Sequence, residues 1–457
     1  MHKSASKRLF GTDGIRGVAG RFPLDDSTVE VIGGALVSNL ARELGRAPRI
    51  VTGRDTRESG PQIELALTRG AMGAGAAVCS AGVITTPGIA YITRSTPFDA
   101  GVVISASHNP YRDNGIKVFS PTGKKLDDEM ERRIEADIDA AAVPARTLSN
   151  LAWPRDQGVI EKEFQTKYID YLANDAGRGL WLGGLKLGLD CANGAASRIA
   201  PDLFSGLGAR VETIFAEPDG RNINEGCGSL HLEGLQRLVV DRRLDLGIAF
   251  DGDADRALFV DAHGMLVDGD ATLLILADDF KKRGLLARNV VVATVMSNIG
   301  LEIALRKLAI ELVRAQVGDR YVLEELLARG ATLGGEQSGH IIFPHISLAG
   351  DGLITSIELL RAMRASSRPL AELAGEMTRY PQVLVNVPVR SRPPLETIDE
   401  VQAEIERLER DLSGRGRLLV RYSGTENLAR VMIEGEDQEK IKEQANQLAE
   451  IIRQKIG

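Results

Sequence analysis

The chain has 457 residues, of which 43% are hydrophobic and 26% are charged, and its formal net charge is −7. Because this length exceeds what one hydrophobic core usually supports, we expect about three or four domains. A negative net charge argues against broad binding to nucleic acids or membrane surfaces, and no run of about 18 apolar residues could span a bilayer. The basic N-terminus has no apolar segment behind it, and the three cysteines form no CxxC pair. Both features predict a cytoplasmic protein.

Short apolar segments alternate with helical patterns over most of the chain, which is typical of βαβ units and mainly parallel sheets. A helix with apolar residues at every fourth position is expected from residue 32, after a capping segment at 25–27. Breaks in the pattern at 142–144, near 256 and at 368–369 indicate domain boundaries. The expected strands of this part are 49–52, 100–105, 185–190, 244–250, 290–295 and 331–334.

The pattern changes after Pro381. A strand at 383–389, a helix at 398–412, two strands at 417–421 and 428–434, and a terminal helix are expected there. These elements predict a small C-terminal α+β domain.

Three aspartates at every second position directly follow the expected strand 244–250. They are Asp251, Asp253 and Asp255, and Arg256 comes next. The carboxyl end of a strand is where α/β proteins bind ligands. Small residues between the aspartates keep the loop compact, so the carboxylates could converge on a hard cation such as Mg²⁺. The alternative is an ordinary acidic turn with its carboxylates in solvent.

A candidate nucleophile follows the expected strand 100–105. Ser107 is followed by His108 and, three positions on, by Pro110. Proline favours the first turn of a helix, whose N–H groups could hold a phosphate, and a phosphorylated serine would offer oxygen to the metal. Hydrolytic chemistry is less favoured because the loop lacks a GxSxG elbow, and a plain capping serine is the alternative.

The dipeptide Asn114-Gly115 is typical of a tight turn, which would bring Lys117 close to the serine loop. A lysine beside a metal and other cations can have a lowered pKa and transfer protons. The alternative for Lys117 is a solvated surface side chain.

Two further loops carry polar groups suited to a sugar phosphate. Glu336 and Ser338 offer a carboxylate and a hydroxyl that suit the vicinal hydroxyls of a sugar, although a capped turn would look similar. The segment Arg421-Tyr-Ser-Gly-Thr-Glu-Asn427, with Arg430 beyond it, combines the donors of a phosphate cradle; a hairpin with surface arginines is the alternative. Two phosphate sites indicate a substrate with phosphate at one end and chemistry at the other.

Five segments in this order resemble the α-D-phosphohexomutase superfamily over essentially the whole chain. They are Gly11-Thr-Asp-Gly-Ile-Arg16, Ser105-Ala-Ser-His-Asn-Pro110, Asp251-Gly-Asp-Ala-Asp-Arg256, Gly335-Glu-Gln-Ser-Gly-His340 and Arg421-Tyr-Ser-Gly-Thr-Glu426. Within the superfamily, the chain is most similar to the branch that acts on glucosamine phosphates. That closer match rests on Thr12-Asp-Gly14, 109–117, Val317-Gly-Asp-Arg-Tyr321, Gln337 and Gly339.

The resemblance implies a fold and a set of roles. The fold would be α/β, with three α/β domains of mixed, mainly parallel sheets and a smaller C-terminal α+β domain around a central cleft. The domains would be 1–152, 153–256, 257–372 and 373–457. Ser107 would be a phosphoserine that, with Asp251, Asp253 and Asp255, holds Mg²⁺. The transferring group would be surrounded by Arg16, His108, Lys117 and Arg256, with Lys117 as first and His340 as second candidate for acid/base catalysis.

The remaining roles concern the sugar. The resemblance implies that Glu336 and Ser338 bind hydroxyls and that the non-reacting phosphate is bound by Arg421, Ser423, Gly424, Thr425 and Arg430. Asn427 stands where the family usually has proline, which leaves the affinity of that loop open. Asp319 replaces a histidine expected in hexose mutases, and we expect it near the amino group of a hexosamine.

The implied reaction interconverts glucosamine 6-phosphate and glucosamine 1-phosphate, with a sugar 1,6-bisphosphate as intermediate and activator. It would feed the synthesis of UDP-N-acetylglucosamine and cell-wall precursors. A phosphomannomutase or phosphoglucomutase shares the machinery and is the main alternative. A phosphatase with an aspartate nucleophile would have Thr or Val at position 255, and a non-catalytic sugar-phosphate sensor would need no transferable phosphate.

We expect a small-molecule partner, with no nucleic acid or membrane, and a homodimer as one assembly to test.

Overall fold

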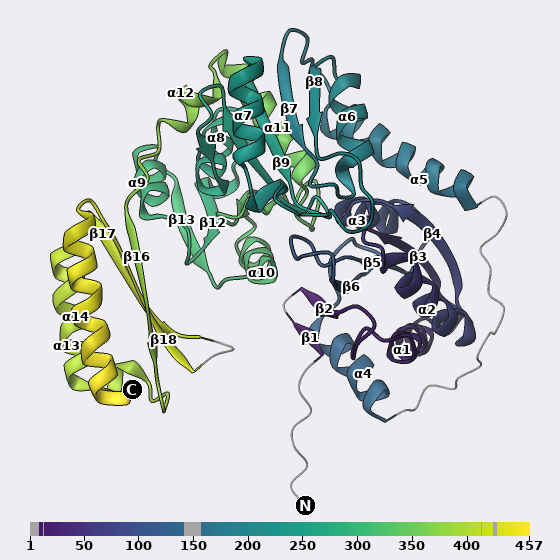
Figure 1. Ribbon diagram of the computed structural model, residues 1–457, viewed down its shortest axis with the longest axis horizontal. Helices are drawn as coiled ribbons and strands as arrows, with labels where there is room; N and C mark the ends of the chain where they lie inside the picture. The colour runs from purple at the N-terminus through teal and green to yellow at the C-terminus, as the bar shows by residue number, and fades with distance from the viewer. Residues whose placement is uncertain (1–8, 12, 141–156, 413, 424–426) are drawn as a thin grey trace, which may run out of the picture. The chain divides into compact units, whose positions relative to one another are not determined.

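A computed structural model describes residues 9–11, 13–140, 157–412, 414–423 and 427–457 (Figure 1). The described residues fall into two compact units. The first comprises Met1–Met296 and Ile310–Gly375, and the second comprises Ser297–Ala309 and Glu376–Gly457. The predicted limit between the first two domains, at 152, lies outside the described residues.

The first sheet has six strands in the order β1-β2-β6-β5-β3-β4. Strands β5, β3 and β4 are parallel, whereas β6, β2 and β1 run antiparallel on one side. Asp25 caps the first helix by accepting the N–H of Thr28, which confirms the predicted capping segment. The elements are β1 (Phe10–Gly11), β2 (Gly14–Val18), α1 (Asp26–Leu44), β3 (Arg49–Arg54), α2 (Gly60–Gly73), β4 (Ala77–Val83), α3 (Thr86–Ser95), β5 (Ala100–Ile104), β6 (Asp113–Phe119) and α4 (Asp128–Asp139).

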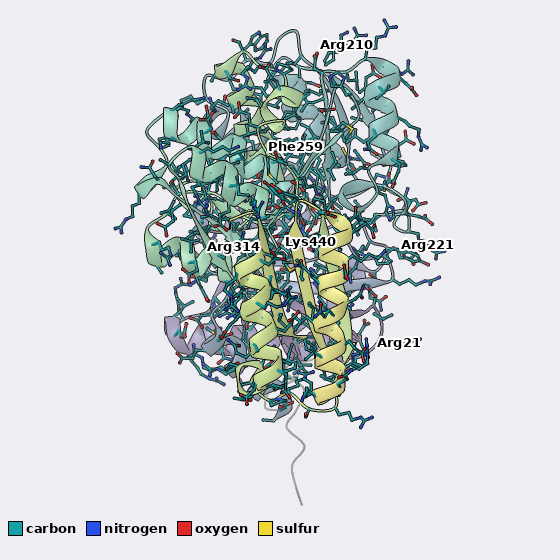
Figure 2. The ribbon with its side chains drawn as sticks, turned by 90° about the vertical axis from the view of Figure 1, so that its left-hand side faces the viewer. Arg21, Arg210, Arg221, Phe259, Arg314 and Lys440 are labelled. Atoms are coloured by element: carbon teal, nitrogen blue, oxygen red, sulfur yellow. The ribbon has the colours of Figure 1, made fainter. Side chains whose placement is uncertain are left out.

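The second sheet has five strands in the order β11-β10-β9-β7-β8, with β9, β7 and β8 parallel. Its strand β10 carries Phe259, which is fully buried inside the first unit (Figure 2). The elements are α5 (Gln157–Tyr171), the π-helical turn η1 (Leu172–Ala176), β7 (Lys186–Asp190), α6 (Ala196–Gly206), β8 (Arg210–Ile214), η2 (Gly228–Leu230), α7 (Glu233–Arg242), β9 (Leu246–Phe250), β10 (Ala257–Asp261) and β11 (Leu266–Val267).

The third sheet has four strands in the order β13-β12-β14-β15, with β15 antiparallel at its edge. The strand expected at 331–334 was misplaced, because β14 is a two-residue strand of glycines that begins only at Gly334. The elements are α8 (Gly269–Lys282), η3 (Ala287–Asn289), β12 (Val290–Thr294), β13 (Glu311–Ala315), α10 (Asp319–Arg329), β14 (Gly334–Gly335), β15 (Ile341–Ile342), α11 (Gly352–Ser366) and α12 (Leu370–Ala374).

One connection recurs in all three sheets of the first unit. The last parallel strand ends, a polar loop follows, and the chain returns as an antiparallel strand. The strand pairs are β5 and β6, β9 and β10, and β14 and β15. Their loops are the predicted serine loop, metal loop and sugar loop, so each candidate loop is the tip of a hairpin.

The second unit contains a three-stranded antiparallel sheet in the order β16-β18-β17. Helices α13 and α14 lie side by side along this sheet (Figures 1 and 2). Helix α9 belongs to the same unit, and Glu434 of β18 accepts the N–H of its first residue, Ile299, at 3.2 Å. The elements are α9 (Ile299–Lys307), β16 (Gln382–Pro388), η4 (Leu395–Thr397), α13 (Asp399–Leu412), β17 (Gly416–Tyr422), β18 (Leu428–Gly435) and α14 (Gln438–Ile456).

Asp190, at the end of β7, joins two loops of the second sheet. Its carboxylate accepts the N–H groups of Ala192 and Gly228, each at 2.9 Å. Burial raises its pKa to about 7, although the two hydrogen bonds act in the opposite direction. Between about pH 4 and about pH 7, Asp190 therefore stays protonated in the folded protein, whereas in the unfolded chain it has lost its proton.

We predict that Asp190 makes the free energy of unfolding decrease as the pH rises from about 4 to about 7, by on the order of 3 kcal/mol. Urea denaturation across this range would measure the slope in the natural protein and in Asp190→Asn. The variant should have a shallower slope, since its amide does not titrate. Equal slopes in the two proteins would contradict this assignment.

Candidate active site

The loop after β9 holds three buried carboxylates at the junction of several segments. Asp251, Asp253 and Asp255 each present an oxygen within 4.8 Å of the others. Three segments far apart in the sequence fix its main chain. These N–H···O contacts are Thr86 to Asp253 at 3.0 Å, Ala195 to Gly252 at 2.8 Å and Gly352 to Ala254 at 3.0 Å.

The donor set of this loop fits a divalent cation. Asp253 Oδ2 accepts hydrogen bonds from Lys117 Nζ at 2.9 Å and Thr86 Oγ1 at 2.5 Å. Its other oxygen, Oδ1, is buried and has no hydrogen-bond partner among the described residues. Burial and the charges of Asp255 and Asp253 raise the pKa of Asp251 well above its usual value. Hard oxygen ligands in such a cluster are those that Mg²⁺ prefers.

Ser107 reaches this loop from the tip of the β5–β6 hairpin. Its side chain is buried, and Oγ donates a hydrogen bond to Asp251 Oδ2 at 2.6 Å. His108 Nδ1 lies 3.2 Å from the same Oγ. The residues around Pro110 form turns rather than the expected helix, so helical N–H groups do not provide a phosphate site there.

Lys117 lies on β6, with its side chain almost fully buried. The Asn114-Gly115 pair is part of the same strand, so the expected turn there was wrong. Burial opposes the charge of Lys117, but Asp13, Asp253 and Asp255 outweigh it and raise the pKa well above its usual value. The lowered pKa expected from the sequence is therefore not found, because carboxylates rather than cations surround the ammonium group.

A cavity of about 440 Å³ opens beside these groups. Its lining includes the predicted site residues Arg16, His108, Arg256 and His340, together with Asp319 and Glu336. Burial and the nearby arginines lower the pKa of His108 to about 4. For His340, burial is outweighed by Asp255 and Asp319, and the pKa rises to about 9. The cavity thus combines the positive charges of Arg16, Arg256 and His340 with several carboxylates, whereas His108 is neutral at about pH 7.

The sugar loop occupies one wall of the cavity. Ser338 Oγ donates a hydrogen bond to Glu336 Oε2 at 3.1 Å, and Glu336 Oε1 accepts the N–H of Gly318 at 3.1 Å. Asp319, at the start of α10, forms an ion pair with Lys125 Nζ at 2.6 Å. The two loops 317–319 and 336–340 therefore form one connected surface.

Sequence reasoning did not select Asp13, Lys125 or Thr86 as site residues. Asp13 lines the cavity and forms ion pairs with Arg16 and Lys125, and it lies 3.3 Å from Lys117 Nζ. Asp13 stands inside the segment Gly11-Thr-Asp-Gly-Ile-Arg16, so the sequence does contain a signal for it. Lys125 and Thr86 have no local pattern that marks them.

The predicted phosphate loop belongs to the second unit. Arg421 of β17 lies directly opposite Arg430 of β18. Burial and the charge of Arg430 lower the pKa of Arg421. Ser423 is buried, whereas Gly424 and Thr425 lie outside the described residues. Two arginines at one end of a hairpin concentrate positive charge that suits an anion.

The fold and the site define an α-D-phosphohexomutase-type protein. Models of the phosphoglucomutase/phosphomannomutase family match all four parts of the chain: domain I at 7–143, domain II at 166–264, domain III at 268–380 and the C-terminal domain at 384–451. The chain belongs to this family. None of the described helices has the length and apolar character needed to cross a membrane.

Within this family, the chain is similar over its whole length to proteins named phosphoglucosamine mutase. The chain is 49% identical over 455 residues to the phosphoglucosamine mutase of Solibacter usitatus, covering 99% of this chain and 100% of that protein. It is also 49% identical over 448 residues to the phosphoglucosamine mutase of Pelotomaculum thermopropionicum, covering 98% and 99%.

Solved structures share the fold. A phosphoglucomutase/phosphomannomutase family protein from Burkholderia thailandensis has a TM-score of 0.81 at 24% identity, covering 98% of each chain. The N-acetylphosphoglucosamine mutase of Aspergillus fumigatus, in complex with GlcNAc-6P and magnesium, has a TM-score of 0.63 at 17% identity, covering 98% and 95%.

We predict that Asp253→Asn weakens the binding of a divalent cation by at least about 10-fold, because it removes one of three converging carboxylate ligands. Titration calorimetry with Mg²⁺ or Mn²⁺ would measure the change. Asp261→Asn is the matched control, since Asp261 is a buried carboxylate of β10 that accepts the N–H groups of His263 and Met265. Equal metal affinity in the natural protein and Asp253→Asn would rule out this site.

Proposed function

We propose that the protein interconverts glucosamine 6-phosphate and glucosamine 1-phosphate through a phosphorylated Ser107. The observation that carries the proposal is the 2.6 Å contact between Ser107 Oγ and Asp251, a member of a buried triad of aspartates beside a cavity lined by arginines, histidines and carboxylates. Relatives that are 49% identical over their full length and bear the name phosphoglucosamine mutase support the choice of substrate.

In the first transfer, a hydroxyl oxygen of the sugar phosphate attacks the phosphorus on Ser107. The sugar O–P bond forms while the Ser107 Oγ–P bond breaks, so the sugar becomes a 1,6-bisphosphate. A basic group takes the hydroxyl proton, and Ser107 Oγ regains a proton as it leaves. The reverse transfer from the other phosphate of the bisphosphate regenerates phosphoserine and releases the isomer.

Phosphoryl transfer depends mainly on positioning and on stabilising charge at the equatorial oxygens. Arg16, His108 and Arg256 line the cavity and can contact these oxygens. Mg²⁺ held by the three aspartates and the Ser107 phosphate would supply further charge stabilisation. For acid/base catalysis we propose Lys117 first and His340 second. Because carboxylates keep Lys117 charged in this structure, it could accept a proton only if their charge were partly neutralised.

A mutase of this kind must bind its intermediate in two orientations. We propose that Glu336 and Ser338 bind hydroxyls in either orientation, and that the non-reacting phosphate is held by Arg421, Ser423, Gly424, Thr425 and Arg430. The opposed arginines of β17 and β18 support this assignment.

A catalytic sugar 1,6-bisphosphate would phosphorylate Ser107 before the first turnover. We place the reaction in the cytoplasm, before UDP-N-acetylglucosamine and cell-wall precursors, and propose a homodimer as the assembly to test.

We predict that the purified protein, with Mg²⁺ and catalytic glucose 1,6-bisphosphate, interconverts the two glucosamine phosphates. Ser107→Ala should lose at least about 10³-fold in kcat, since it removes the phosphoryl acceptor. A coupled assay would measure the rates, with glucose and mannose phosphates run in parallel. A preference for glucose or mannose phosphates would replace the proposed substrate by that of a phosphoglucomutase or phosphomannomutase. No turnover of any of them would favour a sugar-phosphate sensor.

Asp319 is expected to contribute to the preference for an amino sugar over glucose. Its carboxylate lines the cavity and would attract the ammonium group of a hexosamine, although Lys125 already shares its charge. We expect Asp319→Asn to lower the ratio of kcat/KM for glucosamine 6-phosphate over glucose 6-phosphate by about 10-fold, which is about 1.4 kcal/mol. Glu324→Gln on the same helix is the control, because Glu324 is exposed and pairs only with Arg320 among the described residues. An unchanged ratio in Asp319→Asn would refute the assignment.

A further inference from the structure

Ser107 has a main-chain conformation that an L-residue rarely adopts. Its φ is +52°, in the left-handed region. A non-glycine residue is held there only when its surroundings impose the conformation, and such residues cluster at functional sites. The side chain must nevertheless return to the same place after each transfer if Oγ is to donate and regain a phosphoryl group. We therefore expect contacts that fix the main chain of the serine loop in this conformation.

Arg57, in the loop that follows β3, makes such contacts with the main chain of the serine loop. The side chain is fully buried, and each of its five N–H donors has an acceptor. Nε pairs with Asp55 Oδ2 at 2.9 Å, and the remaining donors reach main-chain carbonyls of the serine loop. These are Ser107 at 3.0 Å, Asn109 at 2.8 Å, Asp113 at 3.0 Å and Pro110.

Asp55 extends the same network to the N–H of Ser107. Its Oδ2 accepts a hydrogen bond from Ser105 Oγ at 2.7 Å, and Ser105 Oγ accepts the N–H of Ser107 at 2.9 Å. Both the N–H and the carbonyl of Ser107 are thus fixed by one buried ion pair. A buried pair is favourable only when its other donors are satisfied, as they are here.

Asn224 holds two of these carbonyls from a separate segment of the chain. Its Nδ2 donates to Ser107 O at 2.9 Å and to Asn109 O at 3.0 Å. The Ser107 carbonyl therefore accepts hydrogen bonds from Arg57 and Asn224, while its Oγ points at Asp251. The serine loop is held on its main-chain side by residues that do not touch the reacting atoms.

We propose that Arg57 and Asn224 are positioning residues, which fix the Ser107 backbone so that its phosphorylated side chain occupies one place beside Asp251. This proposal rests on the proposed function. It assigns them to the phosphoryl-transfer step and not to sugar binding, because their partners in the serine loop are main-chain carbonyls. Displacement of a reacting group by about 1 Å can lower a rate by about 100-fold.

Two variants test the proposal. Arg57→Lys keeps the charge beside Asp55 but removes the fork that reaches four carbonyls, and Asn224→Ala removes the second support. We expect kcat to fall about 100-fold in the first and about 10-fold in the second, with KM for the sugar phosphate within about threefold. Arg54→Lys is the matched control, since Arg54 of β3 pairs with buried Glu64 at 3.0 Å, and it should keep the natural kcat.

The rate of Ser107 phosphorylation tests the positioning role separately from the proposed sugar substrate. Intact-mass measurement of Ser107 phosphorylation by glucose 1,6-bisphosphate should show loading slowed by the same factors in both variants. If the natural protein loads but does not interconvert glucosamine phosphates, the proposed substrate fails while loading still tests the positioning role. If Arg57→Lys does not fold, as judged by thermal melting, Asn224→Ala decides alone. A folded variant with natural kcat and loading rate, or one altered only in KM, would overturn the proposal.

Discussion

Three carboxylates buried in one short loop require positive charge, and much of the first unit is arranged to provide it. Lys117 offers its ammonium group to Asp253 and Asp255, Arg256 follows the loop directly, and His340 approaches Asp255 at 3.5 Å. Even so, one oxygen of Asp253 stays without a hydrogen bond among the described residues. An unsatisfied buried carboxylate oxygen is costly. A divalent cation bound among the three carboxylates would give this oxygen a partner.

The hairpin arrangement explains how one loop can collect partners from three sheets. In each sheet of the first unit, a parallel strand ends in a polar loop and the chain returns as a neighbouring antiparallel strand. Such a return places the residues just before and just after the loop on adjacent strands. Lys117 on β6 and Ser107 at the tip of the same hairpin thus reach the same carboxylate cluster. The proposed phosphoryl donor, metal ligands and sugar contacts thus come from three hairpins of similar construction.

Much of this was readable from the sequence, because the strands before the loops are short apolar runs and the loops carry dense polar motifs. The predicted strands at 49–52, 100–105 and 244–250 are confirmed as β3, β5 and β9. Local rules failed where tertiary contacts overrode them. Asn114-Gly115 favours a turn, yet pairing with β2 keeps the chain extended there. Lys125 and Thr86 could not be found by spacing, because their site partners lie more than 100 residues away.

Gly252 shows how tightly the serine and metal loops are joined. A Cβ at this position would meet the Ser107 carbonyl oxygen at 2.6 Å and Ile223 Cδ1 at 2.9 Å. No side chain fits between the two loops at this position, so their main chains pack directly against each other. Directed evolution of this enzyme toward larger sugars would therefore have to act on residues that line the cavity, such as Asp319 and Glu336, and leave Gly252 unchanged.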